Sequence, residues 1–230
     1  MSAPSIGMAV RGLLRRTLDA YRDSPQAAGW LQHHLTRFDE PLRLAIAGKV
    51  KAGKSTLLNA LVGEEIAPTD AGECTRLVTW YRDGHRPEVT LFPQTAPPRQ
   101  LRISRHGQGA LQIDLEGTPL EAIDRLVVTW PTGSLRTTTL IDTPGIGSLS
   151  VETSERTTGF LTPDESPTAA DAVLYLMRHL HSSDVRFLES FHDQGVARAT
   201  PINTIAVLSR ADEVGVGRLD AMLSARMIAR

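Results

Sequence analysis

The sequence predicts an α/β fold in which a mostly parallel sheet carries flanking helices. Three observations lead to this prediction. Short apolar runs alternate with helical segments, as parallel sheets require. One run leads directly into a glycine-rich loop and then a helix. Several further runs with strand character fill the long span before an Asp-Thr-Pro-Gly turn at 142–145, which predicts extra strands inserted there.

Length and composition set the domain organisation. At 230 residues the chain can bury one sizeable core with a small appendage. We expect a helical segment over 1–40 and the α/β domain over 41–230. A net charge of −1 argues against nucleic-acid binding through bulk electrostatics. A single cysteine, Cys74, suits a reducing compartment, so we expect a cytoplasmic protein.

Two helices are expected over residues 7–38. Met8, Leu14, Leu18 and Tyr21 recur at near-helical spacing. Ser24-Pro25 breaks the pattern, and a second helical segment continues to residue 38. The apolar faces of these helices need a partner, either the globular body or something missing from this chain.

The α/β part begins with a buried strand at 42–47, and a helix at 55–62 ends at Gly63. Strands follow at 77–81 and 88–92, with alternating runs near 101–103 and 111–115. A short helix at 120–124 precedes a strand at 126–130. Strands at 138–141, 172–177 and 202–208 complete the sheet, with a helix near 184–191. Ligands of such sheets bind at the carboxyl ends of the strands.

The glycine-rich loop contains all three lysines of the chain, whereas the other strongly basic residues are arginine. Residues 48–55 read Gly-Lys-Val-Lys-Ala-Gly-Lys-Ser, which is the G-x-x-x-x-G-K-S pattern of a phosphate-binding P-loop. Strand, loop and helix give the motif its expected context. Backbone N–H groups of residues 50–55 and the helix N-terminus should surround a phosphate. Lys54 should bridge the β- and γ-phosphates, and the Ser55 hydroxyl should bind Mg²⁺.

Further candidates follow the other strands. Asp142 can hold Mg²⁺ through water, and the Gly145 N–H can face the γ-phosphate. Thr75, with Thr69 as its competitor, is the candidate threonine that completes the Mg²⁺ shell and orients the attacking water. Cys74 is expected to be a half-buried thiol.

The segment Ser209-Arg210-Ala211-Asp212 follows the last strand. Asp212 can accept hydrogen bonds from guanine N1–H and N2–H₂, a donor pair that adenine lacks. Arg210 can lie on the face of the base. The candidate nucleotide-binding set is Gly48, Lys49, Val50, Lys51, Ala52, Gly53, Lys54, Ser55, Thr56, Asp142, Gly145, Ser209, Arg210 and Asp212.

Taken together, GKVKAGKSTLLNALVG, APTDAGECTRLVTWYRDG, DTPGIGSLS and LSRADEVG resemble bacterial dynamin-like proteins, most closely the isoniazid-inducible branch. The discriminating features are Cys74-Thr75 running into a strand and the long span from there to Asp142. The resemblance implies a P-loop GTPase head on a helical neck and nucleotide-dependent homodimers. It also implies contact with membrane lipids at the inner face of the cell membrane, through regions absent from this chain. It further implies that this chain is truncated, because the last strand and helix of such a head are missing.

The resemblance also indicates which residues could act in catalysis. Ras-like GTPases place a Gln after the glycine that corresponds to Gly145, whereas Ile146 stands here. Dynamin has Gln and Ser at the positions of Val50 and Lys51. Atlastins have an arginine finger at that of Lys51. We therefore expect the Lys51 ammonium to neutralise charge in the transition state, with Lys54, Thr75 and Gly145 as the other catalytic candidates. Lys49 is expected to face solvent.

Two main alternatives stay open from the sequence, and an ATP-specific P-loop protein is a weaker third, given Asp212. A soluble GTPase of ribosome or RNA assembly would share the motifs, although the charge balance and the long insert count against it. A nucleotide-binding scaffold without hydrolysis would fit the missing Gln and the incomplete core.

Overall fold

The computed structural model describes residues 5–67, 76–105, 111–145, 170–178, 184, 203–210 and 223. The chain forms two compact units, Met1–Pro41 and Leu42–Arg230. No helix among the described residues combines the length and apolarity that a membrane crossing needs.

The first unit is a pair of helices, α1 (Ile6–Ala20) and α2 (Pro25–Arg37). The Ser5 hydroxyl accepts a 3.4 Å hydrogen bond from the Met8 N–H at the start of α1. Pro25 begins α2, where its missing N–H costs nothing. Arg11 joins the two ends of the pair, because its guanidinium donates to the Asp39 carboxylate at 2.8 Å. Because α1 ends at Ala20 and α2 begins at Pro25, the expected break at Ser24-Pro25 is confirmed.

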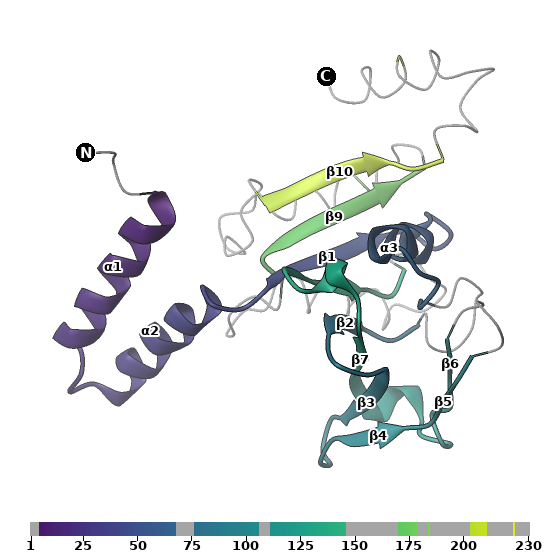
Figure 1. Cartoon of the computed structure of the whole chain (residues 1–230), viewed down its shortest axis with the longest axis horizontal. Helices are drawn as coiled ribbons and strands as arrows, with labels where there is room; N and C mark the ends of the chain where they lie inside the picture. Colours follow the sequence, from purple (N-terminus) through teal and green to yellow (C-terminus); the bar gives the residue numbers. More distant parts are fainter. Residues whose placement is uncertain are drawn as a thin grey trace. The chain divides into compact units, whose positions relative to one another are not determined.

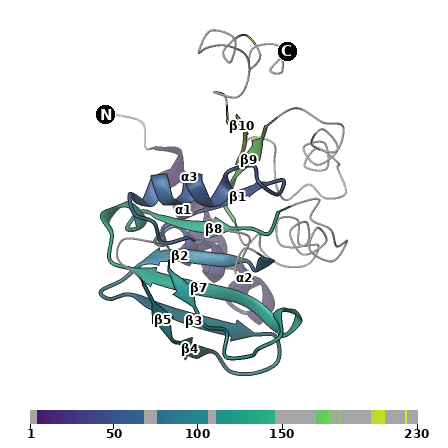
Figure 2. The same ribbon diagram turned by 90° about the vertical axis from the view of Figure 1, so that its right-hand side faces the viewer.

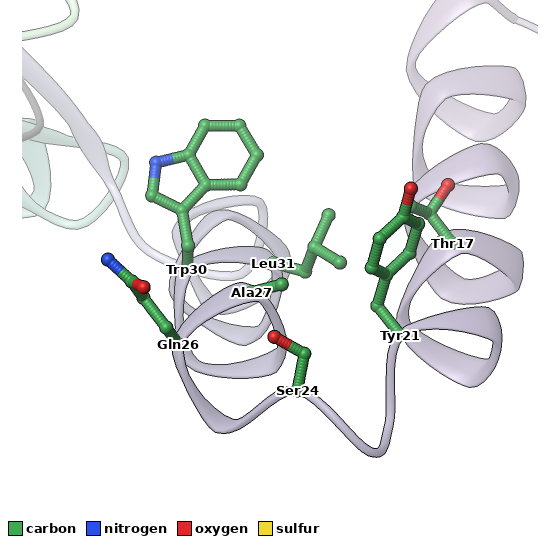
Figure 3. A pocket seen from close by; sticks show the side chains of 7 residues that line it. All are labelled: Thr17, Tyr21, Ser24, Gln26, Ala27, Trp30 and Leu31. Carbon is green, nitrogen blue, oxygen red and sulfur yellow. The ribbon is translucent and has the colours of Figure 1, made fainter.

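The apolar side chains of this pair are largely exposed. Leu31 is the one buried residue among the described residues of the two helices. Met8, Tyr21 and Trp30 are each more than half exposed. Figure 3 shows the hollow between the helices, which is lined by Thr17, Tyr21, Ser24, Gln26, Ala27, Trp30 and Leu31.

The second unit is built on an eight-stranded sheet in the order β10-β9-β1-β8-β2-β7-β3-β4 (Figures 1 and 2). The strands are β1 (Leu42–Gly48), β2 (Thr79–Asp83), β3 (Glu88–Pro93), β4 (Arg99–Leu101), β7 (Ile123–Trp130), β8 (Thr138–Asp142), β9 (Ala172–Met177) and β10 (Thr204–Leu208). The strands β10, β9, β1 and β8 are parallel neighbours. A separate ribbon pairs β5 (Ile103–Ser104) with β6 (Gln112–Ile113).

The sheet changes direction between β8 and β2, which pair antiparallel. Beyond that point β2 and β7 are parallel, and β3 pairs antiparallel with both β7 and β4. The four strands β2, β3, β4 and β7 and the ribbon lie between the P-loop helix and β8 in sequence, as expected for inserted strands. The mostly parallel sheet with flanking helices and inserted strands is confirmed.

Both faces of the central strand are buried. Along β1, Ile46 packs into the larger apolar cluster with Leu58 of α3 (Lys54–Val62), as well as with Leu91 and Leu126. Its neighbours Ala45 and Ala47 point to the opposite face and pack with Ile141, Val173 and Tyr175. Side chains alternate between faces along a strand, so this pattern places β1 in the interior of the sheet, as parallel strands usually are.

Two sequence expectations need correction. The helix predicted over 120–124 is a single 3₁₀ turn, Leu120–Ala122, because β7 already begins at Ile123, whose buried side chain belongs to the sheet core. The strand predicted over 77–81 lies at Thr79–Asp83. Of the helix expected near 184–191, the structure describes Asp184 alone.

Candidate nucleotide-binding site

The glycine-rich loop connects β1 to α3 at the carboxyl end of the central strand (Figure 1). Gly48 closes the strand with φ 142°, a conformation that favours glycine. A Cβ at this position would lie 2.3 Å from the Leu176 carbonyl oxygen on β9. Only glycine lets the loop leave the sheet so close to β9.

The loop then curls tightly into the helix. Lys51 and Gly53 both have left-handed backbone, with φ 63° and 88°. The Ala52 N–H donates to the Lys49 carbonyl at 3.1 Å, and Gly53 is the N-cap of α3. Backbone that alternates between right- and left-handed conformations turns successive N–H groups toward one anion. The N-terminus of α3 adds partial positive charge at the same place.

Lys54 lies inside this curl. Its ammonium donates 3.1 Å hydrogen bonds to the carbonyl oxygens of Gly48 and Lys49. Burial lowers the pKa of Lys54, and the nearby Asp142 carboxylate partly offsets this effect. The loop thus holds a partly buried cation at its centre, where an anionic group would bind.

Ser55 and Asp142 meet beside the loop. Asp142 ends β8, and its Oδ2 accepts a 3.1 Å hydrogen bond from the Ser55 hydroxyl at the start of α3. Asp142 is 8% exposed, and burial raises its pKa to about 6 against the opposing effects of Lys54 and the Ser55 hydroxyl. Its Oδ1 is buried without a hydrogen-bond partner among the described residues.

This pair fits a divalent cation. A buried carboxylate oxygen without a partner in the described part of the chain, next to a serine hydroxyl, offers the oxygen ligands that Mg²⁺ prefers. Such a cation would also offset the desolvation that raises the pKa of Asp142.

Gly145 brings the turn after β8 against the loop. A Cβ on Gly145 would lie 2.7 Å from Val50 Cγ2 and 3.0 Å from both Val50 Cα and Val50 N. The backbone of the Asp-Thr-Pro-Gly turn therefore touches the backbone of the P-loop. The P-loop and the Asp-Thr-Pro-Gly turn, which are separate motifs in the sequence, are therefore in contact in the fold.

Lys49 differs from its expected position. It does not simply face solvent, because its ammonium lies 3.0 Å from Oδ2 of the fully buried Asp184. Oδ1 of Asp184 accepts a 2.7 Å hydrogen bond from the Tyr175 hydroxyl on β9. Lys49 and Asp184 are 135 residues apart, and no local sequence signal marks them as partners.

Asn59 of α3 is a second residue that the sequence reasoning missed. It is buried, and its Oδ1 accepts from the N–H groups of Ile66 and Ala67 at 3.0 and 2.8 Å. Its Nδ2 donates to the Ala67 carbonyl at 3.0 Å. The available signal was a single polar residue within the apolar stretch 57–62 of this helix.

Of the remaining candidate site residues, the structure describes Ser209, Arg210 and Thr56. Ser209 follows β10, and both its N–H and its hydroxyl donate to the Met177 carbonyl, at 2.8 and 3.2 Å. Arg210 comes next with left-handed backbone, φ 52°. Thr56 is exposed on α3. Thr69, Cys74, Thr75 and Asp212 lie outside the described residues.

The described candidates therefore gather at one edge of the sheet. The P-loop, Ser55, Asp142 and Gly145 contact one another, and Ser209 and Arg210 follow β10, two strands from β1. The strands that supply them are parallel, so their carboxyl ends meet at this edge.

Comparisons with known proteins identify the family of this chain. The model of the dynamin family matches residues 44–211. The isoniazid-induced protein IniC of Mycobacterium tuberculosis is 44% identical over 228 residues, which cover 96% of this chain and 46% of that protein. A bacterial dynamin-like protein of Nostoc punctiforme is 29% identical over 162 residues, 65% of this chain and 22% of that protein. The chain thus spans about half or less of the length of these relatives.

Solved structures show the same fold. One member of an oligomerised bacterial dynamin pair, described as sensing and tethering membranes at long range, superposes with a TM-score of 0.61 at 17% identity. The match covers 100% of this chain and 35% of that one. A second chain from such a pair gives a TM-score of 0.52 over 98% of this chain and 42% of its own length. With the family match extending over most of its length, this chain belongs to the dynamin family.

Proposed function

We propose that this chain is the GTP-binding and GTP-hydrolysing head of a dynamin-like protein that remodels membranes. The main support is the hydrogen bond between Ser55 and Asp142, which lies beside the Lys54 ammonium. Both Ser55 and Lys54 belong to the P-loop at the carboxyl end of β1. A membrane role is supported by the similarity to bacterial dynamins, one pair of which is described as tethering membranes. On this proposal the chain works at the inner face of the cell membrane.

In the proposed mechanism the loop binds the phosphates. The N–H groups of residues 50–55 and the N-terminus of α3 receive the β-phosphate. Lys54 exchanges its bonds to the Gly48 and Lys49 carbonyls for bonds to phosphate oxygens. Its position in a partly buried site strengthens this attraction, because few waters compete for the charge.

Ser55 and Asp142 would hold Mg²⁺. When bound, Mg²⁺ neutralises the charge that develops on the β- and γ-phosphate oxygens. Ser55 would hold it with its hydroxyl, and Asp142 would hold it through water, since the buried Oδ1 of Asp142 has no hydrogen-bond partner among the described residues. Thr75 is proposed as the third member of this set and as the residue that orients the attacking water.

Gly145 places its backbone next to the P-loop, where its N–H would face the γ-phosphate. Lys51 is exposed, and we propose that its ammonium neutralises charge in the transition state. At the other end of the site, Ser209 and Arg210 lead toward Asp212, which is proposed to select guanine. Residues 1–40 are proposed as part of the neck of the larger protein, and the head is proposed to dimerise when nucleotide binds.

The test is calorimetric titration of the protein with GTP, GDP and ATP in Mg²⁺ buffer. We expect guanine nucleotides to bind, ATP to bind far more weakly, and Lys54→Ala to abolish binding. Equal affinity for ATP and GTP would remove the role of Asp212, and absence of any nucleotide binding would remove the proposal. A single-turnover assay with and without liposomes then separates a GTPase from a scaffold that binds without hydrolysis.

A further inference from the structure

Asp184 is a buried carboxylate that the proposed mechanism does not use. Asp184 is 0% exposed to solvent. A buried charge is costly unless other groups compensate it, so its contacts indicate what it does. Lys49 donates to one carboxylate oxygen at 3.0 Å, and Tyr175 donates to the other at 2.7 Å.

Tyr175 fixes this carboxylate to the sheet. It is fully buried in the middle of β9, and its register partner on β1 is Ala47, just before the loop. Burial and the neighbouring Asp184 carboxylate both raise the pKa of Tyr175, so its hydroxyl stays a proton donor at physiological pH. Asp184 is therefore held directly beside the point where the P-loop begins.

Lys49 connects Asp184 to Lys54. Its side chain binds Asp184, while its own carbonyl oxygen accepts hydrogen bonds from the Lys54 ammonium and from the Ala52 N–H, both at 3.1 Å. Any displacement of Lys49 would move two of the loop's internal contacts. Its ammonium is also engaged by a buried carboxylate, which argues against direct phosphate contact.

We propose that Lys49 is a positioning residue, held by Asp184 and Tyr175, which fixes the first turn of the P-loop so that Lys54 points at the phosphate. This inference rests on the proposed nucleotide binding. It assigns a role to a lysine that the P-loop pattern leaves variable, and it makes position 184 part of the support of the site.

The experiment measures GDP affinity by fluorescence titration with a labelled GDP in Mg²⁺ buffer. We expect Lys49→Met and Asp184→Asn each to weaken binding by about tenfold, because each removes a charge-assisted hydrogen bond that holds the loop. The double variant should bind no worse than the weaker single variant, because both changes break the same contact. Lys49→Arg should recover most of the affinity.

Two further variants guard against a trivial loss of folding. Tyr175→Phe removes the hydrogen bond to Asp184 and keeps the ion pair of Asp184 with Lys49, so it should weaken binding by only about threefold. Arg99→Met breaks an ion pair between β4, the edge strand farthest from β10, and Glu116, and it should leave GDP affinity unchanged. Urea unfolding of every variant separates altered loops from unfolded protein.

Several outcomes overturn the inference. Wild-type affinity in Lys49→Met does so, and so do losses that simply add in the double variant, which would indicate direct phosphate contact by Lys49. If Lys54→Ala loses GDP while Lys49→Met keeps it, nucleotide binding stands and only the positioning role falls. If the wild type binds no nucleotide, the proposed function fails and this inference fails with it.

Discussion

The Ser55 hydroxyl lies 3.1 Å from Oδ2 of Asp142, although 87 residues separate the two in sequence. This contact joins the first turn of α3 to the end of β8 and leaves the other carboxylate oxygen buried without a partner among the described residues. The charged form of Asp142 is therefore costly to the fold, because burial removes water from the carboxylate.

Asp142→Asn should stabilise the metal-free protein at neutral pH. The native pKa of about 6 lies above the ordinary value of 3.8, so the native state binds the proton more tightly than the unfolded chain. Stability therefore falls as pH rises from about 4 to about 6.5, by a total of about 3 kcal/mol, and then levels off. The Asn variant lacks this loss.

Urea unfolding in EDTA at pH 4.5 and pH 7.5 tests this prediction. The advantage of Asp142→Asn should be small at the lower pH and largest at the higher one. Adding Mg²⁺ with GDP should reverse the order, because the wild type gains binding free energy that the Asn variant loses. An advantage that does not depend on pH would contradict the assigned cause.

Gly145→Ala should disturb the P-loop. The added Cβ meets the Val50 side chain at 2.7 Å and two Val50 backbone atoms at 3.0 Å. Moving packed backbone of this kind costs about 1–3 kcal/mol, so we expect a matching loss in unfolding free energy and weaker GDP binding. The double variant Gly145→Ala/Val50→Ala should recover only part, because the backbone contacts remain. Full recovery would show that the side chain alone sets the limit.

Local patterns predicted much of this fold. The strand expected at 172–177 is β9, and the helix expected at 55–62 is α3 with one added residue. Both predictions depended only on nearby residues. The strand was marked by an apolar run, and the helix by the glycine-rich loop directly before it. The P-loop was recognisable because phosphate binding demands particular residues at particular spacings.

Long-range relationships could not be predicted in this way. The antiparallel pairing of β2 with β8 depends on which strands meet, and no residue within either strand encodes that choice. The partner of Lys49 is fixed by the adjacency of β1 and β9, which places Tyr175 and Asp184 beside the loop. A lysine on a polar loop therefore looked solvent-facing until the sheet order was known.

Asn59→Ala should destabilise the second unit. The change leaves the N–H groups of Ile66 and Ala67 without their acceptor, and both residues are fully buried. We expect a loss of about 2–4 kcal/mol in unfolding free energy by urea denaturation. Thr36→Ala is the control, since its hydroxyl makes a similar 3.0 Å bond to a backbone carbonyl on an exposed helix. It should change stability by less than about 0.5 kcal/mol, and a similar loss in both variants would contradict the role of burial.

Lys51 combines left-handed backbone with an exposed ammonium, so two substitutions separate its contributions. Lys51→Gly relaxes the backbone at φ 63°, whereas Lys51→Ala keeps the strain, so the Gly variant should be more stable by about 1 kcal/mol. Both lack the ammonium. If that charge acts in the transition state, both should hydrolyse GTP slowly in single turnover while still binding GDP. Wild-type rates in Lys51→Ala would end the proposal, and slow hydrolysis in Lys51→Ala alone would assign the effect to loop conformation, because the two variants share the same loss of charge.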